Sequence, residues 1–457
     1  MIAEKIHINE IIGCRFDNSY VLYQHKMSNY KYPVVPLYKF LEVKPQYGAG
    51  EAGVPRNDIT SPRYIRITDI DENGFLSRDL GVTAKTVEEK YILNNNDILI
   101  ARSGNTVGKS YIHKTSIVQD TCFYAGYLIR FVVDAEKILP DYVYILTKLS
   151  PYTNWVKVTQ RVTGQPNINA EEYSNLPIPF PPLEIQQKVV DIYKQAQTER
   201  NNKYQTAKQQ LDSIDDYLLE KLDILLKFDG FNSNCYPINL SKLIGERMDV
   251  GYHNQSKHGL VTEMLKNSKY PTASLASLAK DIFQGVGKNE TDDRTYVLLK
   301  VKNILQGNKI DYSDVEFVKS VPQNKLLLRN DIISPFIGEA VRQIKFSIFN
   351  NEEHKYTVDN NTGVIRIKEG FNAQYVCEYL CSCLGEMQIE RLIGGGGVPF
   401  LGASGAKKII IVVPPIEIQN EIGKNIAYIR NKADDLYKEG DALLENAKQK
   451  IEKLIFE

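Results

Sequence analysis

The stretch "PPLEIQQKVV" at Pro181–Val190 returns as "PPIEIQNEIG" at Pro414–Gly423, 233 positions later. Each copy follows a short apolar run, and each leads into a long segment made mostly of charged and amide residues. An internal repeat decides the architecture of a chain, because each copy folds as a similar unit. The sequence therefore predicts two similar halves, each of which ends in a long helix.

Three further pairs of segments support the duplication. They occur in the same order in both halves, and their spacing differs by only a few residues. The pairs are "IIGCRFDNSY" at Ile11–Tyr20 with "LIGERMDVGY" at Leu243–Tyr252, "NYKYPVVPL" from Asn29 with "NSKYPTASL" from Asn267, and "NNDILIARSG" from Asn95 with "RNDIISPFIG" from Arg329. Four ordered matches indicate a tandem duplication.

The two halves have the same predicted plan. Short β-like runs, broken by Gly, Asn and Asp, predict strands. These runs are Arg63–Ile67, Asp97–Ala101, Tyr127–Val133, Tyr296–Val301, Asp331–Ser334 and Val364–Ile367. Helices are expected after them, at Pro140–Ser150 and Ala373–Gly385. The predicted fold class is α+β: two tandem α/β domains at 1–182 and 230–415, each followed by a long helix, at 183–229 and 416–457.

The two long helices are expected to pair as an antiparallel coiled coil. In the second helix, apolar or small residues recur in steps of three and four, which is a heptad pattern. They are Ile422, Ile426, Ile429, Ala433, Leu436, Gly440, Leu443, Ala447, Ile451 and Leu454; the first helix has Val189, Ile192, Ala196, Leu211, Ile214, Leu218, Leu222 and Leu225. A long helix with one narrow apolar stripe needs a partner helix, and its own copy is the obvious one. The alternative is a coiled coil that only joins two chains.

Composition sets broad limits. The 457 residues carry a formal net charge of zero, so overall charge neither indicates nor excludes a nucleic-acid partner. The six cysteines show no paired metal-ligand spacing and are interpreted as buried thiols rather than a zinc site. No cleavable signal and no run of about 18 apolar residues occurs, which favours a cytoplasmic protein without a membrane segment.

One segment resembles a nucleotide-binding loop. "ILIARSGNTVGKS" at Ile98–Ser110 places a Gly-Lys-Ser after an apolar run. The phosphate-binding pattern needs four residues between its first glycine and the Gly-Lys pair, and this segment has three. The repeat of this segment, "SPFIGEAVR" at Ser334–Arg342, lacks Gly-Lys-Ser altogether. We therefore interpret it as a loop of small residues, with an ATP-using enzyme as the weaker alternative.

The order of these segments resembles the specificity subunit of type I restriction–modification systems. The resemblance covers nearly the whole chain and rests on "YIRITDIDENGFL" at Tyr64–Leu76, "LNNNDILIARSGNTVGKS" at Leu93–Ser110, "GQPNINAEEYSNLPI" at Gly164–Ile178, "LPIPFPPLEIQQKVV" at Leu176–Val190 and "VVPPIEIQNEI" at Val412–Ile422. It implies that each globular unit is a target-recognition domain that reads one half of a split site in double-stranded DNA. The paired helices would set the spacing and dock two methyltransferase subunits, with motor–nuclease subunits joining the complex.

The resemblance also implies which residues contact DNA. Arg suits guanine, Asn and Gln suit adenine, and cations hold phosphates. The candidates in the first half are Arg63, Arg66, Arg102, Ser103, Asn105, Thr106, Lys109, Gln160, Arg161, Thr163, Gln165 and Asn167. Those in the second half are Gln284, Lys288, Lys300, Lys302, Arg342, Lys345, Arg391 and a glycine loop. Tyr47 and Phe283 either pack on the DNA or belong to the core.

Four residues at the start of the long helices are candidates for docking the methyltransferase: Glu184, Gln186, Glu417 and Gln419. Capping of the helix N-termini explains them equally well. The second half departs from the pattern, because "VLLKVKNILQGNKI" and the glycines at Gly394–Gly397 replace the matching segments of the first half. Different loops are expected if the two domains read different half-sites, and equally if the second domain binds DNA poorly.

No methyltransferase, nuclease or cofactor motif is evident, so the chain is expected to be non-catalytic and to need no cofactor or metal. The assembled complex would carry adenine-N6 DNA methyltransferase and ATP-dependent endonuclease activity. Two alternatives remain at this stage: a coiled-coil scaffold that does not read DNA, and a specificity subunit for a fused restriction–methylation enzyme.

Overall fold

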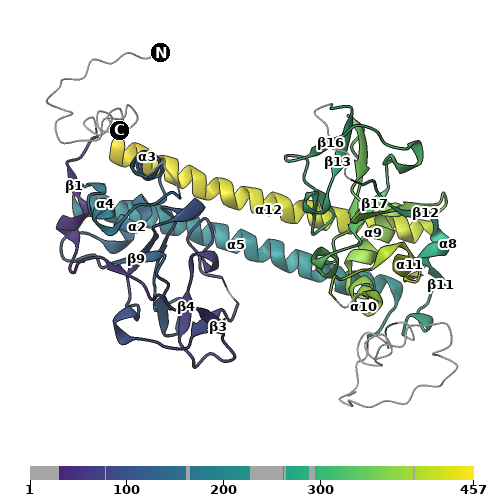
Figure 1. Ribbon diagram of the computed structural model, residues 1–457, viewed down its shortest axis with the longest axis horizontal. Helices are drawn as coiled ribbons and strands as arrows, with labels where there is room; N and C mark the ends of the chain where they lie inside the picture. Colours follow the sequence, from purple (N-terminus) through teal and green to yellow (C-terminus); the bar gives the residue numbers. More distant parts are fainter. Residues whose placement is uncertain are drawn as a thin grey trace. The chain divides into compact units, whose positions relative to one another are not determined.

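The computed structural model describes residues 30–77, 79–160, 165–226, 261, 264–287, 294–394 and 397–457. The chain forms two compact units (Figure 1). Unit 1 consists of Met1–Lys203 with Lys438–Glu457, and unit 2 consists of Tyr204–Tyr437. The repeated segments at Ile11–Tyr20 and Leu243–Tyr252 lie outside the described residues.

Unit 1 contains two four-stranded sheets and a two-stranded ribbon. The first sheet has the order β2-β9-β6-β7 and is antiparallel throughout. The second has the order β3-β5-β4-β8, in which β4 and β8 run parallel, and the ribbon pairs β1 with β10. The strands are β1 Val34–Pro36, β2 Gln46–Tyr47, β3 Gly53–Pro55, β4 Arg63–Ile65, β5 Val82–Ala84, β6 Ile98–Ala101, β7 Ser110–Ile112, β8 Cys122–Tyr124, β9 Leu128–Phe131 and β10 Pro177–Pro179.

Unit 2 repeats the first sheet and the ribbon of unit 1, whereas its second sheet has three strands and a further ribbon pairs β14 with β15. Its sheets have the orders β12-β20-β17-β18 and β16-β13-β19, with β13 and β19 parallel, and β11 pairs with β21. The strands are β11 Thr272–Ser274, β12 Ala279–Gln284, β13 Tyr296–Leu299, β14 Ile304–Leu305, β15 Lys309–Ile310, β16 Glu316–Val318, β17 Ile332–Pro335, β18 Ser347–Ile348, β19 Lys355–Val358, β20 Thr362–Ile367 and β21 Ile410–Val412. Each strand run expected from the sequence is present, so the duplicated α+β fold is confirmed.

An arginine–aspartate pair links the central strands in both units. Asp97, at the entry to β6, accepts a hydrogen bond from Arg130 Nε of β9 at 2.7 Å. Asp331, at the entry to β17, is bound by both Arg366 Nε and Nη2 of β20, at 2.8 and 2.7 Å. Both carboxylates are buried and accept a backbone N–H as well, which offsets the loss of hydration.

Short helices cover the sheets in equivalent order. In unit 1 they are α2 Pro140–Leu146, α3 Ser150–Thr159 and α4 Ala170–Ser174; in unit 2 they are α8 Leu275–Leu278, α9 Ala373–Cys381, α10 Cys383–Leu392 and α11 Gly402–Ala406. The single helix expected at Ala373–Gly385 is wrong, because the chain is extended at Ser382 and α9 and α10 are separate. The apolar pattern did not reveal this break.

The long helices are α5, Leu183–Leu222, and α12, Ile416–Phe456. In both helices, the carbonyl of the proline just before the helix accepts a hydrogen bond from a backbone N–H of the first turn. Gln186 N–H donates to Pro182 O, and Gln419 N–H donates to Pro415 O. The first helix ends earlier than expected from the heptad pattern. Leu225 therefore lies beyond α5 and is 69% exposed instead of belonging to the seam.

The two helices pair in opposite directions within each unit. In unit 1, Arg200 bonds Asp441 at 3.0 Å and Lys203 bonds Glu439 at 2.6 Å. In unit 2, Lys221 bonds Glu421 at 2.6 Å, and Asn425 donates to the Tyr217 hydroxyl at 2.8 Å. Numbers rise along one helix as they fall along the other, so the pairing is antiparallel as predicted.

Each unit is also attached to the helix that begins in the other half of the sequence. In unit 1, Glu452 of α12 accepts the N–H of Ser150 at the start of α3, at 2.6 Å. In unit 2, Asp215 of α5 accepts the N–H of Cys383 at the start of α10, at 3.0 Å. A carboxylate is favourable at a helix N-terminus because free N–H groups and the helix dipole meet there. Both halves of the chain are therefore needed to complete each unit.

Candidate functional site

In unit 1, the loop after β6 pairs with a segment that precedes α4. Gly104 N–H donates to Pro166 O at 2.9 Å, and Ile168 N–H donates to Arg102 O at 2.9 Å. Ser103 and Asn167 form an antiparallel bridge between the two segments. We call the segments Arg102–Thr106 and Gln165–Ile168 the unit 1 loop pair. Two groups of sequence candidates, far apart in the chain, thus come together.

The unit 1 loop pair is not a nucleotide-binding loop. Gly104–Thr106 forms one turn of 3-10 helix, and Ser110 then begins strand β7. A phosphate-binding loop opens a long helix, because the helix N-terminus supplies the free N–H groups. Gly104 has a φ of +77°, which favours glycine at this turn.

Arg102 is held on an aromatic ring. Its guanidinium carbon lies 4.8 Å from the centre of the Tyr47 ring, a distance typical of a cation–π contact. The Tyr47 hydroxyl in turn accepts the N–H of Ala170, the first residue of α4, at 3.1 Å. The Nε of Arg102 and the Oγ of Ser103 have no hydrogen-bond partner within the described part of the chain. Tyr47 therefore belongs to this surface.

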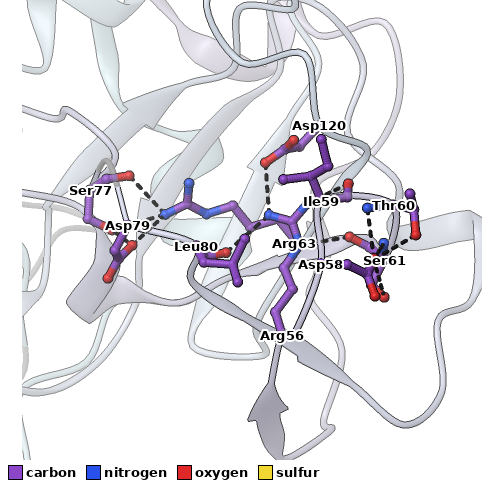
Figure 2. Close-up of polar contacts among 10 residues, drawn as sticks. All are labelled: Arg56, Asp58, Ile59, Thr60, Ser61, Arg63, Ser77, Asp79, Leu80 and Asp120. Atoms are coloured by element: carbon purple, nitrogen blue, oxygen red, sulfur yellow. Dashed lines mark hydrogen bonds and ion pairs between the residues drawn. The ribbon is translucent and has the colours of Figure 1, made fainter. Parts of the chain in front are cut away.

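Other basic candidates of unit 1 already have partners. Arg63 is 5% exposed, and its Nη2 donates to Ser77 O and to Asp79 Oδ1 (Figure 2). Its neighbour Arg56 is enclosed in the same way, with bonds to three backbone carbonyls and to Asp120. These arginines tie loops together, and the Arg63 side chain is not presented to a DNA surface.

The remaining unit 1 candidates fall into three groups. Arg66 is paired with Asp69 at 2.8 Å, and Lys109 with Glu72 at 3.0 Å. Gln160 follows the last residue of α3. Arg161 and Thr163 lie outside the described residues.

Unit 2 contains an equivalent loop pair, which we define as Phe336–Ala340 with Val398–Leu401. Gly338 N–H donates to Pro399 O at 2.9 Å, Leu401 N–H donates to Phe336 O at 3.0 Å, and Ile337 bridges to Phe400. The counterpart of "GQPN" is therefore "GVPF" at Gly397–Phe400. The expectation that Gly394–Gly397 replaces this segment was misplaced, because the glycine run drew attention away from the shared proline, Pro399, two residues after its end.

Three of the six basic candidates of unit 2 are paired with acids. Lys300 pairs with Glu316, Lys302 with Asp314 at 2.7 Å, and Arg342 with Glu339 at 3.8 Å. The Gln284 side chain donates to Asn360 O at 2.9 Å. Lys345 and Arg391 are half-buried, and Lys288 lies outside the described residues. Strand pairing aligns Tyr47 with Gln284, not with Phe283, which is buried beneath Arg366 and Lys325.

The two glutamines at the helix starts are buried inside their own units. Gln186 Oε1 accepts the N–H of Leu139 at 3.1 Å, and its Nε2 donates to Pro181 O at 3.0 Å. Gln419 makes the same two bonds, with Asn372 N–H at 3.0 Å and Pro414 O at 2.8 Å. Each glutamine thus fastens a long helix to the start of a short one. Of the four candidates, only Glu184 and Glu417 are exposed.

Sequence reasoning missed three exposed side chains at the loop pairs. Tyr127, whose carbonyl accepts the N–H of Arg102, is 63% exposed. In unit 2, Val398 and Phe400 are 58% and 41% exposed. Alignment of the two copies around Pro166 and Pro399 would have identified Val398 and Phe400 as the counterparts of Gln165 and Asn167.

The described part of the chain shows neither a metal-binding cluster nor a membrane-spanning helix. Within the described ranges, no group of three or more His, Cys, Asp or Glu residues is arranged to hold a metal ion. No helix in that part of the chain is both long and apolar enough to cross a membrane.

Comparisons with known proteins agree on one kind of protein. Residues 63–210 match the family model of the type I restriction modification DNA specificity domain. In Methanocaldococcus jannaschii, the type I restriction enzyme MjaVIII specificity subunit is 23% identical over 404 residues, covering 86% of this chain and 84% of that protein. The MjaIX specificity subunit of the same organism is 21% identical over 384 residues, covering 82% and 78%. A crystal structure of the type I restriction–modification S subunit from M. genitalium is 13% identical and covers 97% of this chain and 98% of that one, with a TM-score of 0.44.

Proposed function

We propose that this chain, which belongs to the specificity subunits of type I restriction–modification systems, reads a split DNA site with one half-site for each unit. The coarser statement, that it is a specificity subunit, comes from the family match and the curated relatives. The finer statement rests on the two loop pairs. Their backbone bonds are the same, whereas their exposed side chains differ at nearly every position.

This difference is the observation that carries the proposal. Backbone contacts set the position of a loop, but hydrogen bonds and apolar contacts to base edges specify sequence. Unit 1 presents Arg102, Asn105, Gln165 and Asn167, which are donors and acceptors suited to guanine and adenine. Unit 2 presents Glu339, Val398 and Phe400, which suit a cytosine amino group and thymine methyl groups. Two copies with one shape and two chemistries are what a bipartite reader requires.

The helix pair is proposed to set the spacer between the half-sites. Both α5 and α12 run through unit 1 and unit 2 as single helices. A helix rises about 1.5 Å per residue, whereas DNA rises about 3.4 Å per base pair. One heptad inserted in both helices, after Lys203 and after Tyr437, keeps the seam in register. It is expected to lengthen the DNA spacer by about 3 base pairs without changing either half-site.

The exposed starts of the long helices are proposed to dock two methyltransferase subunits, one for each copy of the junction. Glu184 and Glu417 are the exposed members of the four docking candidates. The methyltransferase and the motor–nuclease subunits that join the complex would supply its chemistry. This chain would contribute no catalytic group.

A base-resolution methylation map of the host genome, with and without this gene, tests the proposal. Loss of one split, spaced motif upon deletion is the expected result. An unchanged map in a host where the methyltransferase is expressed and active would contradict the proposal and favour a scaffold that does not read DNA.

A further inference from the structure

Arg102 differs from every other described arginine of unit 1. Each of the others forms an ion pair: Arg56 with Asp120, Arg63 with Asp79, Arg66 with Asp69, Arg130 with Asp97 and Arg200 with Asp441. Arg102 forms none with any residue that the structure describes, although its backbone is bonded on both sides. Its charge is therefore available to a ligand.

Tyr47 holds this free guanidinium in place. The ring supports the guanidinium face at 4.8 Å, and the hydroxyl is fixed by the N–H of Ala170. A stacked guanidinium loses little further side-chain freedom when it binds, because its plane is already oriented. The arrangement therefore favours an acceptor that meets the planar edge of the guanidinium, and disfavours a diffuse contact to the DNA backbone.

The surroundings of Arg102 point to a base rather than a phosphate. The polar side chains of the unit 1 loop pair include the exposed amides of Asn105 and Gln165 and the half-buried amide of Asn167, which donate and accept in one plane. Its backbone neighbour Tyr127 is an exposed aromatic residue. Among bases in the major groove, guanine presents two adjacent acceptors, O6 and N7, which match the two donors of a guanidinium edge.

We propose that Arg102, positioned by Tyr47, reads a guanine in the half-site of unit 1 by donating to its O6 and N7. The inference rests on the proposed function, because it assumes that unit 1 reads DNA. Unit 2 has buried Phe336 in place of Arg102 and Gln284 in place of Tyr47, so its half-site has no guanine read in this way. Arg102 is the specificity-determining residue, and Tyr47 is a positioning residue.

The test uses the full chain in complex with its methyltransferase and a duplex that contains the mapped motif. Each guanine of the unit 1 half-site is replaced in turn by 7-deazaguanine, which lacks the N7 acceptor. For one position, replacement is expected to weaken binding by the unaltered chain about tenfold, as for the loss of a charged hydrogen bond. Arg102→Ala is expected to bind the natural and the replaced duplex equally well, and Arg102→Lys to show a smaller difference.

Three further variants separate base reading from charge and from stacking. Lys39→Ala removes another cation that lies over a tyrosine, Tyr38, in the same unit, at 5.1 Å. It is expected to retain the tenfold effect. Tyr47→Leu removes the ring and is expected to reduce the effect severalfold without changing the dependence of affinity on salt. Tyr47→Phe loses only the hydroxyl. Its loss of affinity on 7-deazaguanine replacement is expected to lie between that of the unaltered chain and that of Tyr47→Leu.

The outcomes separate the two proposals. If the chain recognises a split motif but no 7-deazaguanine position depends on Arg102, the guanine inference is overturned and the proposed function stands. If Arg102→Ala lowers affinity equally for every duplex and reduces the salt dependence, the arginine contacts phosphate and the inference is again overturned. If the unaltered complex shows no sequence preference at all, the proposed function fails first.

Discussion

Units 1 and 2 share a scaffold but differ in what the scaffold presents. Asn105, Gln165 and Asn167 in unit 1 correspond to Glu339, Val398 and Phe400 in unit 2. The bonds beneath them, from Gly104 to Pro166 and from Gly338 to Pro399, have the same length. Backbone bonds tolerate any exposed side chain, so the two copies have diverged in chemistry without losing shape. Separation of shape from chemistry is what the proposed reading of two half-sites by one fold would require.

A second difference lies in the interior. In unit 2, Glu378 of α9 is fully buried and pairs with Arg430 of α12 at 2.8 Å. The corresponding residues of unit 1 are Ile145, which is buried, and Gln197. Glu378 also accepts bonds from Asn308 and Gln374 at 3.0 and 2.8 Å. Unit 2 therefore fastens its long helix with a buried charge network where unit 1 uses apolar packing.

The largest expected effect comes from breaking that network. Arg430→Ala leaves the Glu378 carboxylate buried without its counter-charge, and the loss is expected to be about 3–5 kcal/mol of unfolding free energy in unit 2. Hydrogen exchange of the β17 and β20 amides would measure it. Trp155, the single tryptophan of the chain, lies in unit 1 and serves as the internal control. The double variant Glu378→Ile with Arg430→Gln, which copies unit 1, is expected to recover much of the loss. Equal exchange in Arg430→Ala and in the exposed-pair variant Lys302→Ala would refute the explanation.

The next effect concerns a feature that the two units share. Gln186→Ala and Gln419→Ala each leave a buried backbone N–H and a proline carbonyl without partners, at a cost of about 1–3 kcal/mol. Because the two glutamines make equivalent bonds, the two variants are expected to lose equal unfolding free energy. Trp155 fluorescence would measure the loss in unit 1, and hydrogen exchange would measure it in unit 2. Gln187→Ala, an exposed neighbour on α5, is the matched control and should change little. A loss of stability in only one of the two units would show that the two glutamines do not contribute equally to stability.

The smallest effect separates the units by pH. His113 is buried beside Tyr111 in unit 1, and Phe349 takes its place in unit 2. Burial lowers the pKa of His113 to about 4, below its value of about 6.5 in an unfolded chain. Between these values the unfolded state binds more protons, so the stability of unit 1 falls as the pH drops from about 6.5 toward 4.

At pH 5 the expected loss in unit 1 is about 1–2 kcal/mol relative to pH 7. His113→Phe is expected to remove this difference, and His354→Phe, which changes an exposed histidine of unit 2, is expected to preserve it. Urea unfolding followed by Trp155 fluorescence at the two pH values would measure both. An equal pH dependence in His113→Phe and the unaltered chain would show that another group titrates.

The repeat predicted the fold well because periodicity and order are properties of the sequence. It located the strands and the start of each long helix. The repeat did not predict features that depend on contacts between residues far apart in the sequence. Arg63 looked available, but its partner Asp79 is brought to it by a loop 16 residues away. The early end of α5 and the break at Ser382 also depend on tertiary packing, which a heptad or apolar pattern does not contain.

The site was predicted in part for the same reason. Arg102, Ser103, Asn105, Gln165 and Asn167 were all named from the sequence, but their meeting in one loop pair depends on backbone bonds between segments about 60 residues apart. The apolar surface of unit 2 was missed because candidates were chosen among charged and polar side chains, which can hydrogen-bond to bases or phosphates. Exposed Val398 and Phe400 have no polar side-chain group and so gave no signal under that criterion.

The most direct test of the account is a methylation map of cells that express one of two altered chains. One carries Gln165→Ala with Asn167→Ala in unit 1, and the other carries Val398→Ala with Phe400→Ala in unit 2. Each pair is expected to relax or change one half of the split motif, a different half in each case, at constant spacer length. If both pairs alter the same half, or if each alters both halves, the two units do not read separate half-sites.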